Sequence, residues 1–193
     1  KIKVGHAGTL DPLATGLLII CTGRQTKNID SFQKLDKTYT GTFYLGMTTP
    51  SYDLETTPVR YVNSGHIDEE KLRKAARQLT GIQLQTPPLY SAKKIEDERA
   101  YTHARKGLNT LLKPNQVEVK EFIINNIRLP EVDFRIVCSK GTYIRALARD
   151  FGEIAGCGAY LASLRRTHIG TYSAEDALSP EDTAAILSLS HSG

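Results

Sequence analysis

Two neighbouring apolar stretches in the second half of the chain constrain its fold more than any other feature. Residues 132–138 alternate between apolar and polar side chains, which predicts a strand with one buried face. Residues 117–129 predict a longer strand before it, with a shift of phase near Phe122 that indicates a bulge. Because only Pro130 and Glu131 separate the two strands, we expect an antiparallel hairpin.

Other stretches predict a further strand and several helices around this hairpin. Residues 38–45 alternate and predict a strand. Helical spacing of apolar residues predicts one helix over 144–151, ended by Gly156, and another that begins after Asp68. Shorter helices are predicted at residues 98–106 and 181–187. This mixture predicts an α+β fold with a mixed, largely antiparallel central sheet flanked by helices.

Composition limits the classes of protein to consider. The 193 residues, of which 40% are hydrophobic, suffice for one domain with a buried core. A formal net charge of +4 is compatible with an anionic partner. The three cysteines form no C-x-x-C pair, which indicates buried free thiols in a reducing compartment. The sequence has no apolar run of membrane length, and we expect no signal peptide.

The segment from Gly5 to Gly16 combines Gly, Thr and Pro with a single carboxylate, Asp11. Its glycines allow the backbone to approach a ligand closely, and Pro12 fixes the turn after the acid. An aspartate in such a loop can be a nucleophile or general base, or it can cap a turn, and the residue pattern leaves both open. Residues 17–21 predict a buried apolar element that would hold the Asp11 loop in place. Further along the chain, residues 48–58 predict a second loop, which we expect to be mobile.

This loop resembles the catalytic motif of the TruB family of pseudouridine synthases, and Asp11 lies at the position of the catalytic aspartate. Further stretches match other motifs of that family in the same order. They are Lys37-Thr38-Tyr39, residues 87–92 followed by residues 99–101 and 104–107, residues 139–145 and residues 164–167. The resemblance runs from Lys1 to about Ser173, and five ordered motifs are far more specific than any one of them.

The resemblance implies roles for six residues around the target uridine. Asp11 would be the essential carboxylate, Arg145 would hold it as a bidentate partner, and Tyr39 would stack on uracil and move a proton. The positions of Tyr143 and Leu164 match residues that line the uracil pocket. His6 matches a histidine that fills the RNA loop once the target base has flipped out.

The resemblance also implies the substrate and the partners. The substrate would be uridine 55 in the T-arm stem-loop of tRNA, and candidate phosphate contacts are Lys93, Arg105, Lys140, Arg165 and Arg166. No metal or organic cofactor, membrane or obligatory protein partner is implied, and we expect a cytoplasmic monomer. We expect residues 1–173 to form the catalytic domain and residues 174–193 a short helical tail. We expect the family's usual N-terminal segment and its PUA domain to be absent.

Three other interpretations compete with this one. The chain could be a non-catalytic tRNA-binding or RNA-folding domain, which would bind tRNA without forming product. It could belong to the guide-RNA-dependent, dyskerin-like branch, whose members need partner subunits and a PUA domain. Residues 91–94 formally match the S-x-x-K motif of serine acyl-enzymes, but the S-D-N and K-T-G motifs that accompany it do not occur.

Overall fold

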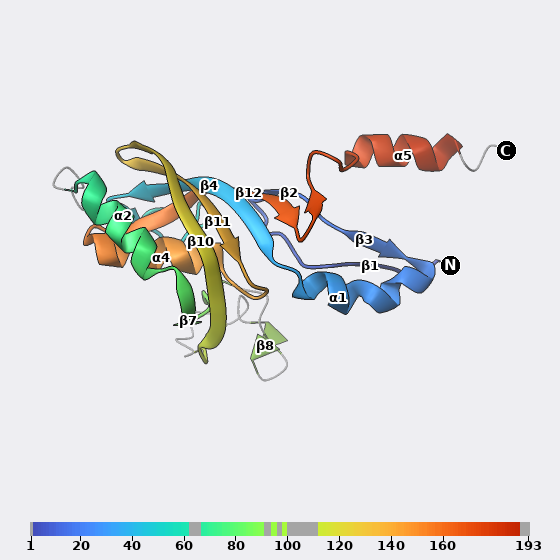
Figure 1. Ribbon diagram of the computed structural model, residues 1–193, viewed down its shortest axis with the longest axis horizontal. Coiled ribbons are helices and arrows are strands. Elements are labelled where there is room, and N and C mark those ends of the chain that lie inside the picture. Colours follow the sequence, from blue (N-terminus) through green and yellow to red (C-terminus); the bar gives the residue numbers. More distant parts are fainter. Residues whose placement is uncertain (1, 62–66, 91–93, 96–97, 100–111, 190–193) are drawn as a thin grey trace.

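The computed structural model describes residues 2–61, 67–90, 94–95, 98–99 and 112–189 (Figure 1). The strands are β1 (Val4–His6), β2 (Thr15–Gly16), β3 (Ile20–Thr22), β4 (Lys37–Leu45), β5 (Met47–Thr48), β6 (Arg60–Tyr61), β7 (Gly81–Gln85), β8 (Lys94–Ile95), β9 (Glu98–Arg99), β10 (Asn115–Arg128), β11 (Glu131–Cys138), β12 (Ala159–Ile169) and β13 (Tyr172–Ser173). The helices are the 3-10 helix η1 (Gly23–Asn28), α1 (Ile29–Lys34), α2 (Glu69–Gln78), α4 (Ile144–Ala155) and α5 (Pro180–Leu189).

The central sheet confirms the predicted α+β class. Its strands follow the order β13-β12-β4-β11-β10-β7, all in antiparallel pairs, and β2 adds a parallel pairing to β12. The β10–β11 hairpin forms as predicted, with Arg128 opposite Glu131. Register shifts flank Phe122, between Val119 and Glu121 and again beyond Ile124, so the predicted bulge region is confirmed.

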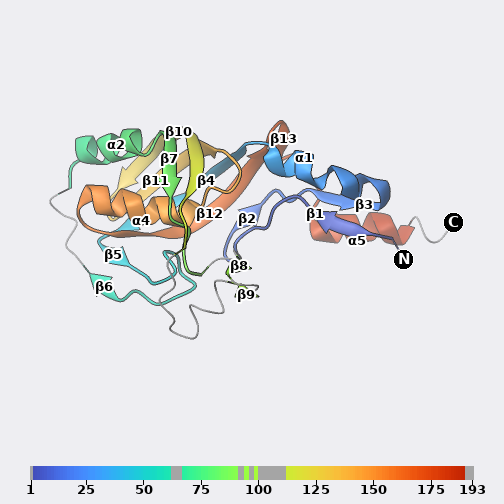
Figure 2. The same cartoon turned by 90° about the horizontal axis from the view of Figure 1, so that it is seen from below.

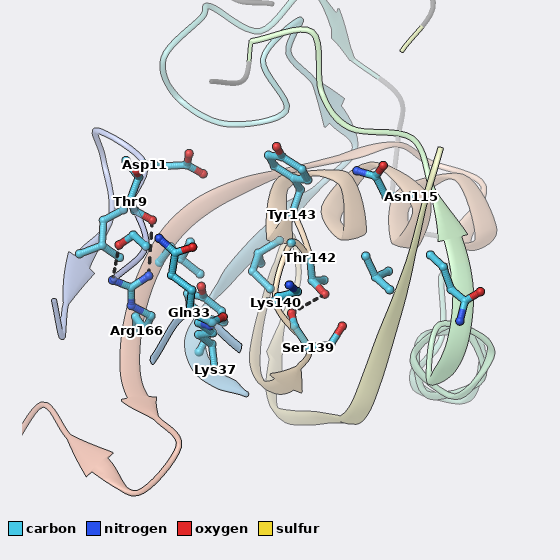
Figure 3. Close-up of a pocket in the computed structure, with 18 residues that line it drawn as sticks. Thr9, Asp11, Gln33, Lys37, Asn115, Ser139, Lys140, Thr142, Tyr143 and Arg166 are labelled. Atoms are coloured by element: carbon cyan, nitrogen blue, oxygen red, sulfur yellow. Dashed lines mark hydrogen bonds between the residues drawn. The ribbon is translucent and has the colours of Figure 1, made fainter. Parts of the chain in front are cut away.

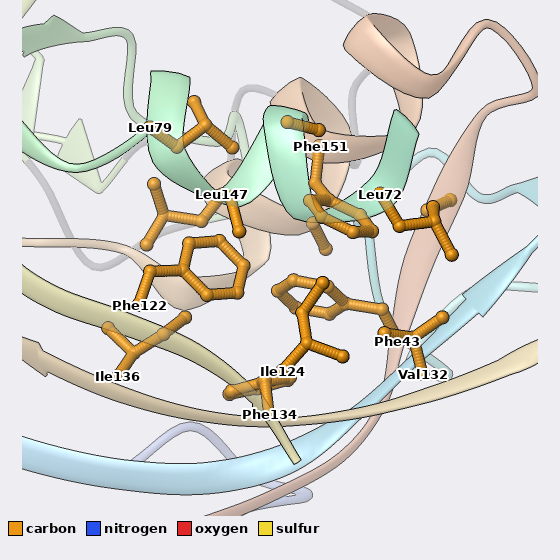
Figure 4. Packing of buried hydrophobic residues seen from close by; sticks show 14 of the residues in the cluster. Phe43, Leu72, Leu79, Phe122, Ile124, Val132, Phe134, Ile136, Leu147 and Phe151 are labelled. Carbon is orange, nitrogen blue, oxygen red and sulfur yellow. The ribbon is translucent and has the colours of Figure 1, made fainter. Parts of the chain in front are cut away.

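The hydrophobic core lies between the sheet and the helices α2 and α4, which pack on the same face (Figure 4). Phe43 of β4 packs against Phe134 and Phe151, with ring centroids 4.2 Å and 5.4 Å apart. Both predicted helices are confirmed. The Asp68 side chain caps α2 by accepting a hydrogen bond from the backbone N–H of Lys71, and Gly156 ends α4 with a left-handed φ of 79°.

The β1–β3 hairpin, α1 and α5 lie at one end of the molecule, beyond the helix-covered part of the sheet (Figures 1 and 2). The expectation of a buried element at residues 17–21 is only half right. Leu17 and Cys21 are buried, but Leu18 is 38% and Ile20 54% exposed. Burial alternates along β3, because successive side chains of a strand point to opposite faces and only one face of β3 is packed against the described part of the protein.

The short helix predicted at residues 98–106 is not confirmed. Residues 98–99 form β9, which pairs with β8, and the remainder of the predicted helix lies outside the described residues. The helix predicted at 181–187 lies within α5. No helix in the described part of the chain is long and apolar enough to span a membrane.

Candidate active site

Asp11 and Arg145 are 134 residues apart in the sequence and form a bidentate ion pair in the fold. Arg145 Nε donates to Asp11 Oδ2 over 2.8 Å, and its Nη2 donates to Oδ1 over 2.9 Å. Arg145 lies in the first turn of α4 with its side chain only 2% exposed, while about a third of the Asp11 side chain is exposed. A buried fork therefore orients a carboxylate that still reaches solvent.

A second carboxylate, Asp53, shares the same guanidinium. Its Oδ2 lies 3.4 Å from Arg145 Nε, and its side chain is 5% exposed. The backbone oxygens of Tyr90 and Ser51 accept hydrogen bonds from Arg145 Nη1. Asp53 is not recognisable as a site residue from the sequence, because it lies among residues 48–58, which were expected to form a mobile loop. Ser51 and Asp53 are instead buried, because they surround the guanidinium.

Arg166 braces the loop on either side of Asp11. Its guanidinium is buried and donates to three backbone oxygens, those of Leu17, Gly8 and Thr9. A Cβ on Gly16 would lie 2.2 Å from the Arg166 carbonyl oxygen, so only glycine fits where β2 meets β12. The expectation that Arg166 contacts RNA phosphate is therefore wrong, since its donors are used inside the protein.

Replacing Arg166 with lysine should reduce turnover much more than RNA affinity. Arg166→Lys keeps the charge but cannot hold all three carbonyls, and misplacing Asp11 by about 1 Å can lower the rate roughly 10²-fold. Turnover and dissociation constants on one RNA would be compared with those of Arg77→Lys, on the exposed surface of α2. A loss of affinity with unchanged turnover would contradict the bracing role.

Asp11 opens onto a cleft of about 560 Å³ between the loop, β4, β12 and the β11–α4 turn (Figure 3). Tyr39, Tyr143, Leu164 and Lys140, four of the predicted site residues, line it together with Asp11. Burial raises the pKa of the Tyr39 hydroxyl to about 12. Tyr39 therefore keeps its proton at neutral pH.

Tyr143 is held at the start of α4 by a buried glutamine that the sequence analysis did not identify. Gln85 Oε1 accepts from the Tyr143 backbone N–H over 2.8 Å, and Gln85 Nε2 donates to the Tyr143 carbonyl over 3.1 Å. The amide thus satisfies both backbone groups of the residue that precedes α4. This clamp fixes the start of the helix that carries Arg145.

The remaining predicted contacts are dispersed. Lys140 is exposed at the rim of the cleft, in the turn after β11. His6 is exposed on β1 and does not line the cleft. Arg165 lines a separate hollow with Thr40 and Thr42, because neighbouring strand residues point to opposite faces. Lys93 and Arg105 lie outside the described residues.

The chemistry available in the cleft is that of carboxylate, phenol and guanidinium groups. Within the described ranges, no group of three or more His, Cys, Asp or Glu side chains could hold a metal ion. All three cysteines are buried and free, and burial raises the pKa of the Cys138 thiol to about 12. Among the described residues that line the cleft, Asp11 is the one carboxylate.

Comparison with known proteins identifies the class first. A family model described as "TruB family pseudouridylate synthase (N terminal domain)" matches residues 1–144, and one described as "tRNA pseudouridylate synthase B C-terminal domain" matches residues 145–191. The chain is a pseudouridylate synthase by these matches, and the fold and the Asp11 cleft agree with this class.

Individual relatives specify the family. A tRNA pseudouridine synthase B from Flavobacterium johnsoniae is 52% identical over 92% of this chain and 78% of its own length. The protein of the same name from Parabacteroides distasonis is 50% identical, over 94% of this chain and 77% of its own length. The chain belongs to the TruB family.

Solved structures show the same fold. One chain of a "Cbf5-Nop10-Gar1 Complex" superposes with a TM-score of 0.66 at 26% identity, over 89% of this chain. The match covers 41% of that solved chain. The predicted resemblance and fold class are thereby confirmed.

Proposed function

We propose that this chain converts a uridine of tRNA to pseudouridine, at position 55 in the T-arm stem-loop, and that it acts alone as a monomer. The observation that carries the proposal is the Asp11 carboxylate, held by Arg145 at the mouth of a cleft that also contains Tyr39. Relatives about 50% identical over nine-tenths of the chain are named tRNA pseudouridine synthase B.

The geometry supports Asp11 as the catalytic carboxylate. In the reaction, the bond between N1 of uracil and C1′ of ribose breaks, a bond between C5 and C1′ forms, C5 loses a proton and N1 gains one. A carboxylate beside the nucleotide can attack the ribose or the base, or can stabilise charge as the bond breaks. Arg145 orients Asp11 for this step from a buried position.

Tyr39 is proposed to stack on the base and to relay a proton in the second half of the reaction. Tyr39→Phe keeps the ring and removes the hydroxyl, so the rate should fall about 10²- to 10⁴-fold with little change in RNA affinity. Because burial raises its pKa to about 12, Tyr39 should give no alkaline limb to the wild-type pH–rate profile between pH 7 and about pH 10. A near-normal rate of Tyr39→Phe would leave Tyr39 with stacking alone.

Recognition is proposed to depend on the folded RNA. The base must leave its stack to reach Asp11, and this is easiest in a loop. Exposed Lys140 lies at the rim of the cleft, where it can contact the phosphate backbone of the RNA. Exposed His6 lies on β1, and it is proposed to fill the position in the RNA loop that the flipped base leaves. Lys93, Arg105 and Arg165 remain predicted phosphate contacts.

The decisive experiment is to incubate the chain with an unmodified T-arm stem-loop and to measure pseudouridine at position 55. A linear strand of the same sequence, tested at two salt concentrations, serves as the control. We expect product from the hairpin only, with binding that weakens steeply as salt rises. Tight binding without product would instead support the non-catalytic tRNA-binding alternative, and equal turnover of both RNAs would exclude recognition of shape.

A further inference from the structure

Gln85 is a buried amide to which neither the family motifs nor the proposed function assigns a role. Among the described residues, the largest fully buried side chains include three polar ones, Gln85, Arg145 and Arg166. Arg145 holds Asp11 itself and Arg166 holds the loop around it, so two of the three serve the candidate site. Burial of a polar group is unfavourable unless hydrogen bonds offset the loss of water, which makes the partners of Gln85 informative.

The Gln85 amide matches both backbone groups of Tyr143. Tyr143 precedes α4 with an extended backbone, at φ −96° and ψ 111°. The N–H and the carbonyl of an extended residue point to the same side, as they do where antiparallel strands exchange two hydrogen bonds. The amide takes the place of a partner strand, because its oxygen accepts over 2.8 Å and its nitrogen donates over 3.1 Å. This pairing requires a side chain with a donor beside an acceptor.

The contact controls two residues of the candidate site. Tyr143 lines the cleft, and Arg145, two residues further along the chain, holds Asp11 (Figure 3). The Tyr143 carbonyl also accepts the hydrogen bond from the Leu147 N–H, over 3.2 Å, so the residue held by Gln85 belongs to the first turn of hydrogen bonds in α4. Because Arg145 is tightly packed, a shift of the helix start would displace its guanidinium as well.

The central sheet provides the fixed support for this contact. Gln85 ends β7, which is paired with β10 along its length. Beyond Gln85 the chain continues along α4, where the Thr86 carbonyl accepts from Arg149 and the Tyr90 carbonyl accepts from Arg145. Gln85 is the buried side chain at the start of this segment, and it connects the edge of the sheet to the beginning of the helix.

We propose that Gln85 is a positioning residue of the uridine reaction, whose amide holds Tyr143 and Arg145 in the arrangement that the reaction requires. The inference rests on the proposed function, since it assigns to Gln85 an effect on that reaction. Because Gln85 is buried, it acts on bound RNA only through these two residues. Loss of the amide should therefore slow the reaction of bound RNA and leave RNA affinity nearly unchanged.

The first test is Gln85→Met, which keeps the length of the side chain and removes both hydrogen-bonding groups. Gln83→Met is the matched control, because Gln83 lies on the same strand and its Nε2 donates to the Leu79 carbonyl of the α2 end over 2.8 Å. Single-turnover rates and dissociation constants are measured on the T-arm stem-loop, well below the lowest unfolding temperature. Gln85→Met should be slower by about 10- to 100-fold with affinity within about 2-fold, and Gln83→Met should match wild type.

The second test is the pH dependence of Gln85→Glu. An ionised carboxylate accepts from the Tyr143 N–H but cannot donate to the Tyr143 carbonyl, whereas a protonated carboxyl can do both. Burial raises the pKa of the introduced carboxyl, so it takes up its proton at mildly acidic pH. The rate of Gln85→Glu divided by that of wild type should rise about 10-fold from about pH 8.5 to about pH 6. Division by the wild-type rate removes the titration of groups that both proteins share.

A purely structural hydrogen bond would lower the unfolding temperature of Gln85→Met and leave the single-turnover rate of the folded protein unchanged. That result, or a rate ratio for Gln85→Glu that does not rise as the pH falls, would overturn the inference. If Gln85→Met does not fold, the pH dependence of Gln85→Glu decides the question alone. Wild-type turnover upholds the proposed function in each of these cases, whereas a wild type that forms no pseudouridine would overturn the proposed function itself.

Discussion

Asp11→Asn should lower turnover by about 10³-fold or more while the protein stays folded and still binds RNA. The amide has the shape of the carboxylate but lacks its negative charge and its nucleophilicity. Folding should survive because the Asp11 side chain is partly exposed and because Arg145 keeps Asp53, Tyr90 and Ser51 as partners.

Single-turnover rates on the T-arm stem-loop, together with RNA dissociation constants and unfolding temperatures, measure this effect. Asp30→Asn, on the exposed surface of α1, is the control and should behave as wild type. Retained turnover in Asp11→Asn would exclude Asp11 as the catalytic carboxylate. Loss of RNA binding with unchanged turnover of the bound RNA would assign Asp11 a binding role.

Arg145→Lys is expected to damage both activity and stability. A lysine ammonium is a single point charge that cannot hold Asp11 through two parallel hydrogen bonds and also serve Asp53 and two carbonyls. Asp53 would be left buried with a poor partner, and breaking a buried ion pair typically costs about 3–5 kcal/mol of unfolding free energy. Turnover should fall by about 10²-fold or more because Asp11 loses its orientation.

Denaturant unfolding and turnover of the same preparations measure the two effects. Arg77→Lys, on the exposed surface of α2, is the matched control. The double variant Arg145→Met/Asp53→Leu removes the buried charge together with its partner, so it should recover part of the stability but no activity. Full activity of Arg145→Lys would show that charge alone suffices and that the bidentate geometry is not used.

The sequence determined the fold class because the local patterns agree with the tertiary arrangement. The alternation of 132–138, the phase shift near Phe122 and the helical stripe from Ile144 each depend on one buried face, so they can be recognised without knowing the partner. The predicted helix at 98–106 had no such support, and residues 98–99 form a strand instead.

The motifs of the sequence also determined the principal residues of the candidate site. Asp11, Tyr39, Tyr143 and Leu164 meet around one cleft, with Arg145 as the partner of Asp11. Their catalytic and binding roles stay predictions until the variants are measured. The positions of Arg165 and Arg166 within their motif could not show that the two side chains point to opposite faces of β12. Arg165 is exposed to solvent in a separate hollow, whereas Arg166 is buried and braces the Asp11 loop.

Only the tertiary structure identified the residues that support the site. Asp53, Gln85 and the bracing role of Arg166 depend on contacts between segments far apart in the chain, which a local sequence pattern does not show. The physical reason is that a buried charge or amide is stable only where distant backbone and side-chain groups satisfy it. The sequence by itself therefore determined which family motifs are present and how apolar and polar residues alternate along the strands. Long-range pairing of buried polar groups, in contrast, decided how Asp11 is held.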